Sequence, residues 1–72
     1  MAENIVAEIV ASVLEVRVTP GQRVDVGDTI VLLESMKMEI PVLAEEPGTI
    51  AEVQVSVGDV IQAGHVIATL DD

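Results

Sequence analysis

The chain repeats its own pattern at an interval of 37 residues. When the sequence is shifted by that interval, residues 12–34 align with residues 49–71, and seven of the 23 pairs are identical. The shared pattern is an apolar run, Val-x-x-Gly, five residues, a second Gly and another apolar run. Glycines in this setting are typical of turns that need a positive φ. The repeat therefore predicts two similar halves, each a short β-meander.

The apolar residues are mostly β-branched, which favours strands. They include 14 Val, 7 Ile and 5 Leu, with no Phe, Tyr or Trp. Alternation and turn signals predict strands at residues 4–10, 12–18, 24–26, 29–34, 38–42, 49–55, 61–63 and 66–70. Eight strands in two equivalent halves predict an all-β fold, a flattened β-barrel or sandwich of two antiparallel four-stranded sheets with pseudo-two-fold symmetry. We expect a single domain over residues 1–72.

The charge balance excludes several classes of partner. The net charge of −10 would repel phosphate backbones, and the lack of aromatic residues removes the stacking surfaces that single-stranded nucleic acids need. The chain does not start with a basic segment followed by an apolar one. No apolar run approaches the length that crosses a bilayer. We therefore expect an acidic, cytoplasmic protein that binds neither nucleic acid nor membranes and is a monomer when isolated.

Lys37 is the only lysine of the chain and lies near its midpoint, within Glu34-Ser35-Met36-Lys37-Met38-Glu39. One apolar run, residues 29–34, leads in and another, residues 39–43, leads out, which places the lysine in a turn. Turns between strands usually contain Gly, Asn or Asp, whereas Met-Lys-Met offers none of them. A local rule that is broken at one place indicates function. The sequence thus presents one side-chain amine, at a turn, for acylation.

These residues resemble the biotin-attachment signature of biotin carboxyl carrier proteins, in which the central lysine receives biotin in amide linkage. The longer string ESMKMEIPV, residues 34–42, is similar to small stand-alone biotin/lipoyl attachment proteins and to short biotinylated carrier-like proteins of mycobacteria. The resemblance extends over nearly the whole chain. It implies the biotinyl/lipoyl domain fold, with biotin attached to Lys37.

The resemblance also implies a non-catalytic carrier role. A biotin protein ligase would modify Lys37, and the biotin would act as a swinging arm that carries a carboxyl group between a biotin carboxylase and a carboxyltransferase. We interpret the residues that flank Lys37 as contacts for recognition by the ligase: Glu34, Ser35, Met36, Met38 and Glu39. Methionine suits this role because its flexible side chain adapts to a partner surface. The other interpretation is that Met36 and Met38 only pack within the hairpin.

Two alternatives stay open from the residues. The first is a lipoyl carrier for oxo-acid dehydrogenase or glycine-cleavage chemistry, since an acid three residues before the lysine occurs in biotin and lipoyl domains alike. Glu34 therefore supports attachment without selecting the cofactor, whereas the flanking methionines favour biotin over lipoate. The second alternative is a purely structural interaction module.

The remaining polar residues predict no catalytic residue and no metal site. His65 is the only histidine and follows a turn Gly, and the chain has no Cys. The residues that nucleophilic catalysis or a zinc site would require are therefore missing. Asp25, Asp28, Glu45 and Glu46 do not have the spacing of a calcium loop. We interpret them as solvated charges that discourage pairing at strand edges.

One position departs from the family pattern. Family members usually open each half with a segment that ends in Gly-Thr, and the second half has it as Gly48-Thr49. The first half reads Ala11-Ser12 at the same place, so Ala11 replaces the expected glycine.

Overall fold

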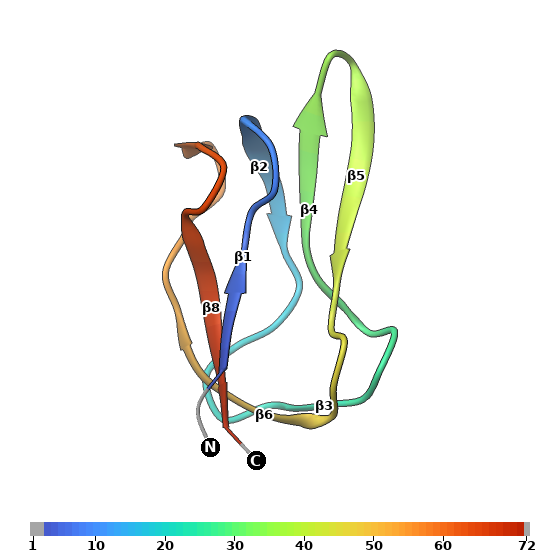
Figure 1. The fold of residues 1–72 in the computed structure, drawn as a ribbon, viewed down its shortest axis with the longest axis vertical. Coiled ribbons are helices and arrows are strands. Elements are labelled where there is room, and N and C mark those ends of the chain that lie inside the picture. The colour runs from blue at the N-terminus through green and yellow to red at the C-terminus, as the bar shows by residue number, and fades with distance from the viewer. Residues whose placement is uncertain (1–2, 72) are drawn as a thin grey trace.

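The computed structural model describes residues 3–71, which form eight strands and no helix (Figure 1). The strands are β1 (Glu3–Val6), β2 (Ala11–Val16), β3 (Arg23–Val24), β4 (Thr29–Ser35), β5 (Met38–Leu43), β6 (Gly48–Val53), β7 (Val60–Ile61) and β8 (Val66–Asp71). Each strand predicted from the sequence is present. Within this range no helix is long and apolar enough to cross a membrane.

Some predicted strand ends were wrong. The first strand ends at Val6 instead of Val10, because its partner β8 begins at Val66 and the residues beyond it have no strand with which to pair. Likewise, β2 and β6 end at Val16 and Val53, two residues earlier than predicted, as the chain enters the next turn.

The strands form two antiparallel four-stranded sheets, in the orders β1-β8-β6-β3 and β5-β4-β2-β7. A shift of four strands converts the first order into the second, as a pseudo-two-fold axis requires. Each sheet contains two strands from each half of the sequence, so the halves interlock and neither forms a sheet alone. The predicted all-β sandwich of two four-stranded sheets is confirmed.

Main-chain hydrogen bonds between the halves come in symmetric pairs. The Gly21 N–H donates to the Ile50 carbonyl at 2.7 Å, and the Gly58 N–H donates to the Val13 carbonyl at 2.9 Å. These four residues are related by the 37-residue shift. The Ala7 and Ala44 N–H groups also donate to equivalent turns, which extends the structural repeat upstream of the residues that align in sequence.

The glycines of the repeat lie in four similar turns. Gly21, Gly27, Gly58 and Gly64 have φ of 91°, 91°, 95° and 89°. In each turn the residue after the glycine donates its N–H to the carbonyl three positions earlier, at 3.0–3.1 Å. The positive-φ turns predicted from the repeat are confirmed.

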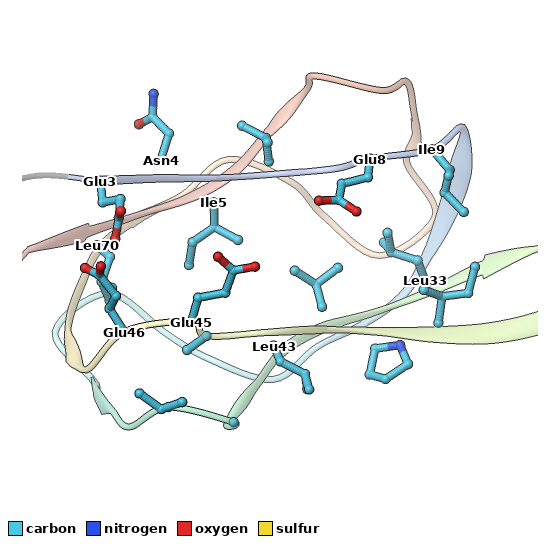
Figure 2. A pocket seen from close by; sticks show the side chains of 17 residues that line it. Glu3, Asn4, Ile5, Glu8, Ile9, Leu33, Leu43, Glu45, Glu46 and Leu70 are labelled. Atoms are coloured by element: carbon cyan, nitrogen blue, oxygen red, sulfur yellow. The ribbon is translucent and has the colours of Figure 1, made fainter.

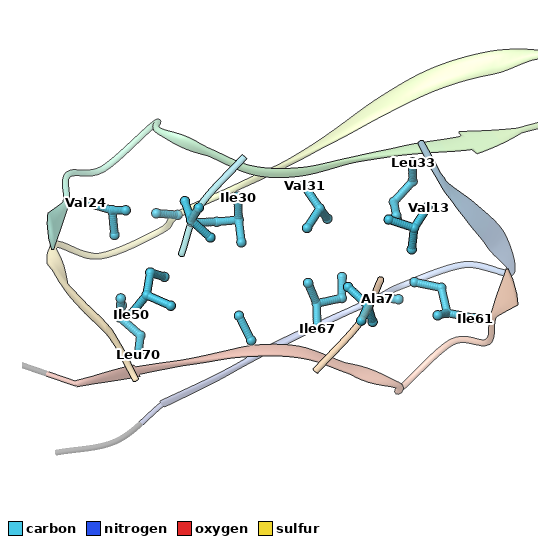
Figure 3. Packing of buried hydrophobic residues seen from close by; sticks show 14 of the residues in the cluster. Ala7, Val13, Val24, Ile30, Val31, Leu33, Ile50, Ile61, Ile67 and Leu70 are labelled. Atoms are coloured by element: carbon cyan, nitrogen blue, oxygen red, sulfur yellow. The ribbon is translucent and has the colours of Figure 1, made fainter. Parts of the chain in front are cut away.

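The core lies between the two sheets and contains no aromatic side chain (Figure 3). Its largest fully buried side chains are Ile30, Leu33, Ile50, Ile61, Ile67, Val13, Val24 and Val31. Two identical pairs of the repeat, Ile30 with Ile67 and Leu33 with Leu70, are buried in this core, and Leu33 and Leu70 lie at opposite ends of it. The sequence repeat therefore conserves apolar residues at equivalent buried positions of the two halves.

Ala11 is accommodated within β2, where it is buried and pairs with Ile61. Its counterpart Gly48 lies in β6, close to the main chain of Asp71. The two equivalent positions therefore have different space around the Cα atom, and only the second requires glycine.

Candidate functional site

Lys37 lies at the tip of the β4–β5 hairpin, at the end of the molecule opposite Glu3 and Asp71 (Figure 1). Ser35 pairs with Met38, so the connection consists of Met36 and Lys37 alone. The predicted position of the lysine in a turn is confirmed. Because the molecule measures 33 × 18 × 17 Å, the hairpin marks one end of its long axis.

The turn is made without the residues that favour it. Met36 and Lys37 have φ of 53° and 64°, the only positive values at non-glycine residues among those described. Positive φ at both central residues is the geometry of a type I′ hairpin turn, which Asn-Gly adopts more readily. For an L-residue this conformation costs about 1–2 kcal/mol. The hairpin therefore retains Met and Lys against their backbone preference.

The residues of the turn are open to solvent. Met36 is 92% exposed, Met38 is 65% exposed, and Lys37 is also exposed. Within residues 3–71, the Lys37 amine forms no salt bridge or hydrogen bond, and neither Glu34 nor Glu39 pairs with it. The amine is therefore accessible to the active site of another protein.

The five predicted recognition residues surround the lysine but point to different sides of the hairpin. Glu34 and Glu39 pair across the strands and are exposed on the outward face of the sheet. Ser35 and Met38 form the next pair and lie on the opposite face. Met38 continues the row of Ile40 and Val42, which pack against the core. A partner that encloses the tip would meet carboxylates on one side and a thioether on the other.

A groove that the sequence did not predict lies between the edge strands β1 and β5 (Figure 2). Its volume is about 720 Å³, and Ile5, Leu33 and Val42 contribute apolar walls. Glu8 and Glu45 point into the space between these segments. Its walls come from segments far apart in the sequence, so no local pattern indicated it. Lys37 is not among its lining residues, and the groove is separate from the tip of the β4–β5 hairpin.

Two aspartates of the repeated turns, Asp28 and Asp59, have structural roles. The Asp28 carboxylate accepts the N–H of Asp25 at 2.8 Å, and the Asp59 carboxylate accepts the N–H of Ser56 at 2.8 Å. These side chains hold the repeated turns closed. Among residues 3–71, no group of three or more His, Cys, Asp or Glu side chains is placed to hold a metal ion.

Comparison with known proteins identifies the family. The family described as "Biotin-requiring enzyme", the biotin/lipoyl domain, matches residues 3–70. The chain is 64% identical to a protein of Mycobacterium leprae named "Biotinylated protein TB7.3 homolog", over 97% of this chain and 99% of that protein. It is 68% identical to the protein of the same name from Mycolicibacterium smegmatis, over 99% of this chain and all of that protein. The chain belongs to the biotin/lipoyl attachment family.

Solved structures of both cofactor classes share the fold. One is a single-chain, multi-domain long-chain acyl-CoA carboxylase, with a TM-score of 0.89 and 26% identity over 94% of this chain and 7% of that chain. Another is the lipoyl domain of the 2-oxoglutarate dehydrogenase complex from Azotobacter vinelandii, with a TM-score of 0.77 and 28% identity over 94% of this chain and 96% of that chain. The fold is therefore common to biotin and lipoyl domains, and the cofactor must be argued from the hairpin.

Proposed function

We propose that this protein is a biotin carrier in which a biotin protein ligase attaches biotin to Lys37. The observation that carries the proposal is the exposed Lys37 side chain at the tip of a two-residue turn between two exposed methionines, with no salt bridge or hydrogen bond from its amine within residues 3–71. The names of the mycobacterial relatives, biotinylated proteins that match this chain end to end, support it. The tethered biotin then carries a carboxyl group between a biotin carboxylase and a carboxyltransferase.

The attachment step requires only a nucleophile from this chain. Lys37 Nζ attacks the activated carboxyl carbon of biotin, an amide bond forms as the bond to the adenylate breaks, and the proton of the amine passes to a base. No carboxylate or imidazole of residues 3–71 bonds to Lys37. The ligase therefore supplies the base, and the hairpin supplies access and position.

The carrier role follows from tethering. Biotin bound to Lys37 would supply the carboxyl-carrying chemistry, while the barrel holds it out at one end of the long axis. Tethering raises the effective concentration of the cofactor at each partner enzyme. The chain thus contributes reach and orientation, and it catalyses neither half-reaction.

Similarity to a carboxylase subunit supports the proposal that the partner enzyme is a carboxylase. The chain is 41% identical to the alpha3 subunit of a biotin-dependent acyl-coenzyme A carboxylase of Mycobacterium leprae, over 94% of this chain and 11% of that subunit. The second candidate is a lipoyl carrier, favoured by the shared fold with the lipoyl domain of the 2-oxoglutarate dehydrogenase complex. The two flanking methionines favour biotin.

Mass spectrometry of the intact protein tests the function. The protein is incubated separately with a biotin protein ligase and biotin and with a lipoate ligase and lipoate, each with ATP. We expect one biotin per chain, mapped to Lys37 by peptide digestion, and no modification of a Lys37→Arg variant that retains its circular dichroism. Labelling of the folded Lys37→Arg variant would place attachment at the N-terminal amine, and lipoylation alone would support the second candidate.

A further inference from the structure

The sulfur atoms of this protein are concentrated at the attachment tip. The chain has no cysteine and three methionines, Met1, Met36 and Met38. Both methionines within residues 3–71 therefore flank Lys37, one on each side. A thioether is more readily oxidised than the aliphatic, amide and carboxylate groups that make up most other side chains of this chain. The most oxidisable groups of the described structure thus lie beside the amine that is to be acylated.

The exposure of these thioethers is unusual for their residue type. Methionine is most often buried, whereas Met36 is 92% exposed and Met38 is 65% exposed. Neither residue belongs to the core cluster or to the partly buried side chains packed against it. A small oxidant reaches both sulfur atoms without any opening of the barrel, and oxidation removes no core contact.

We propose that Met36 and Met38 form a reversible oxidation site that controls the transfer of biotin to Lys37. The inference rests on the proposed function, because it requires a ligase that buries the two side chains. The oxidant is a hydroperoxide such as hydrogen peroxide. The thioether sulfur attacks one peroxide oxygen, the O–O bond breaks, a sulfoxide forms, and the second oxygen leaves as water. Sulfur loses two electrons and the peroxide gains them.

The sulfoxide changes the surface that the ligase meets. An apolar, adaptable side chain becomes a polar one, and burying its oxygen without a hydrogen-bond partner costs free energy. Methionine sulfoxide reductases restore the thioether, with one enzyme for each sulfoxide epimer. The site is therefore reversible, and newly made protein escapes biotinylation while it is oxidised.

The test compares the protein with a Met36→Leu/Met38→Leu variant, which keeps two apolar side chains but has no sulfur in residues 3–71. Each protein is treated with hydrogen peroxide, catalase then removes the oxidant, and kcat/KM for biotin transfer is measured. Sulfoxides are mapped by peptide mass spectrometry, and circular dichroism with urea unfolding checks the fold. Single Met36→Leu and Met38→Leu variants show which sulfoxide acts.

We expect oxidation to lower kcat/KM of the natural sequence by about tenfold or more, with an unchanged urea midpoint. Treatment with both reductases should restore the rate. The double leucine variant should keep the kcat/KM that it has before peroxide, whatever that value is relative to the natural sequence. Equal transfer to fully oxidised and untreated protein overturns the inference, as does the same loss in the leucine variant. Failure of the untreated protein to accept biotin overturns the proposed function instead.

Discussion

Glu34 and Glu39 lie directly opposite each other on adjacent strands of the hairpin that presents Lys37. Both side chains are exposed, and in the described residues neither forms a salt bridge. Like charges directly across a strand pair destabilise a sheet. The pair therefore has no stabilising role in the isolated protein, which is consistent with a role as a contact for the ligase.

Replacing Glu34 or Glu39 with Gln should separate stability from recognition. Removal of the repulsion should raise the free energy of unfolding by about 0.2–1 kcal/mol at low salt, and the gain should shrink at 1 M NaCl as the charges are screened. The same variants should show a lower kcat/KM with the ligase. Urea unfolding and transfer assays measure the two effects.

A Glu46→Gln variant provides the control for this prediction, because it changes the net charge equally but lies beyond the end of β5 that is distant from Lys37. It should leave biotin transfer unchanged. A loss of transfer as large as that of Glu34→Gln would mean that the ligase responds to overall charge.

The internal repeat predicted much of the fold because it repeats the positions that a β-sandwich constrains most. The glycine spacing specified the turns, and Ile30, Leu33, Ile67 and Leu70 recur since they fill equivalent sites of the core. The pairing of strands between the two halves could not be predicted from the repeat. A repeat shows that two units are alike, but it does not specify that β1 pairs with β8 and not with a strand of its own half.

The candidate attachment site was predicted from one chemical signal, a single lysine between two methionines in a turn. Its backbone could not be predicted in the same way. The positive φ of Met36 and Lys37 follows from the two-residue connection that the β4–β5 register imposes, and it contradicts the local preference of both residues. The groove between β1 and β5 depends on tertiary placement and leaves no local pattern.

Equivalent turn glycines should respond equally to substitution. Gly21 and Gly58 have φ of 91° and 95°, and a Cβ atom at either position would meet no atom within 4 Å. Valine is therefore disfavoured by backbone strain alone, and Gly21→Val and Gly58→Val should each lower the free energy of unfolding by about 1–3 kcal/mol. Urea midpoints equal to that of the natural sequence would show that these turns tolerate other backbone conformations.

Gly48 and Ala11 should lose different amounts of stability on substitution despite their equivalence in the repeat. A Cβ atom at Gly48 would lie 2.5 Å from the main-chain oxygen of Asp71 and 2.9 Å from Leu70 Cγ. Gly48→Ala should therefore destabilise the fold by about 1–3 kcal/mol, whereas Ala11→Gly should cost only about 0.5–1 kcal/mol from added chain entropy. Thermal and urea unfolding of the two variants provide the comparison, and equal losses would contradict it.

Cofactor choice should depend on the residues on either side of Lys37. The double variant Met36→Asp/Met38→Ala replaces two exposed methionines and creates an Asp-Lys-Ala turn that resembles those of lipoyl domains. Aspartate is among the non-glycine residues that most readily adopt positive φ, so the turn should form and circular dichroism should be unchanged. Each methionine buried by the ligase contributes roughly 1.5–3 kcal/mol at full burial, so biotin transfer should fall by about tenfold or more. Lipoyl transfer should rise.

Measurement of kcat/KM with both ligases on both proteins tests the prediction. The control for loss of a surface apolar group is Val26→Asp, because Val26 is 65% exposed and lies in a turn between β3 and β4. If the preference does not change, the ligases distinguish their substrates by the barrel surface and not by the turn.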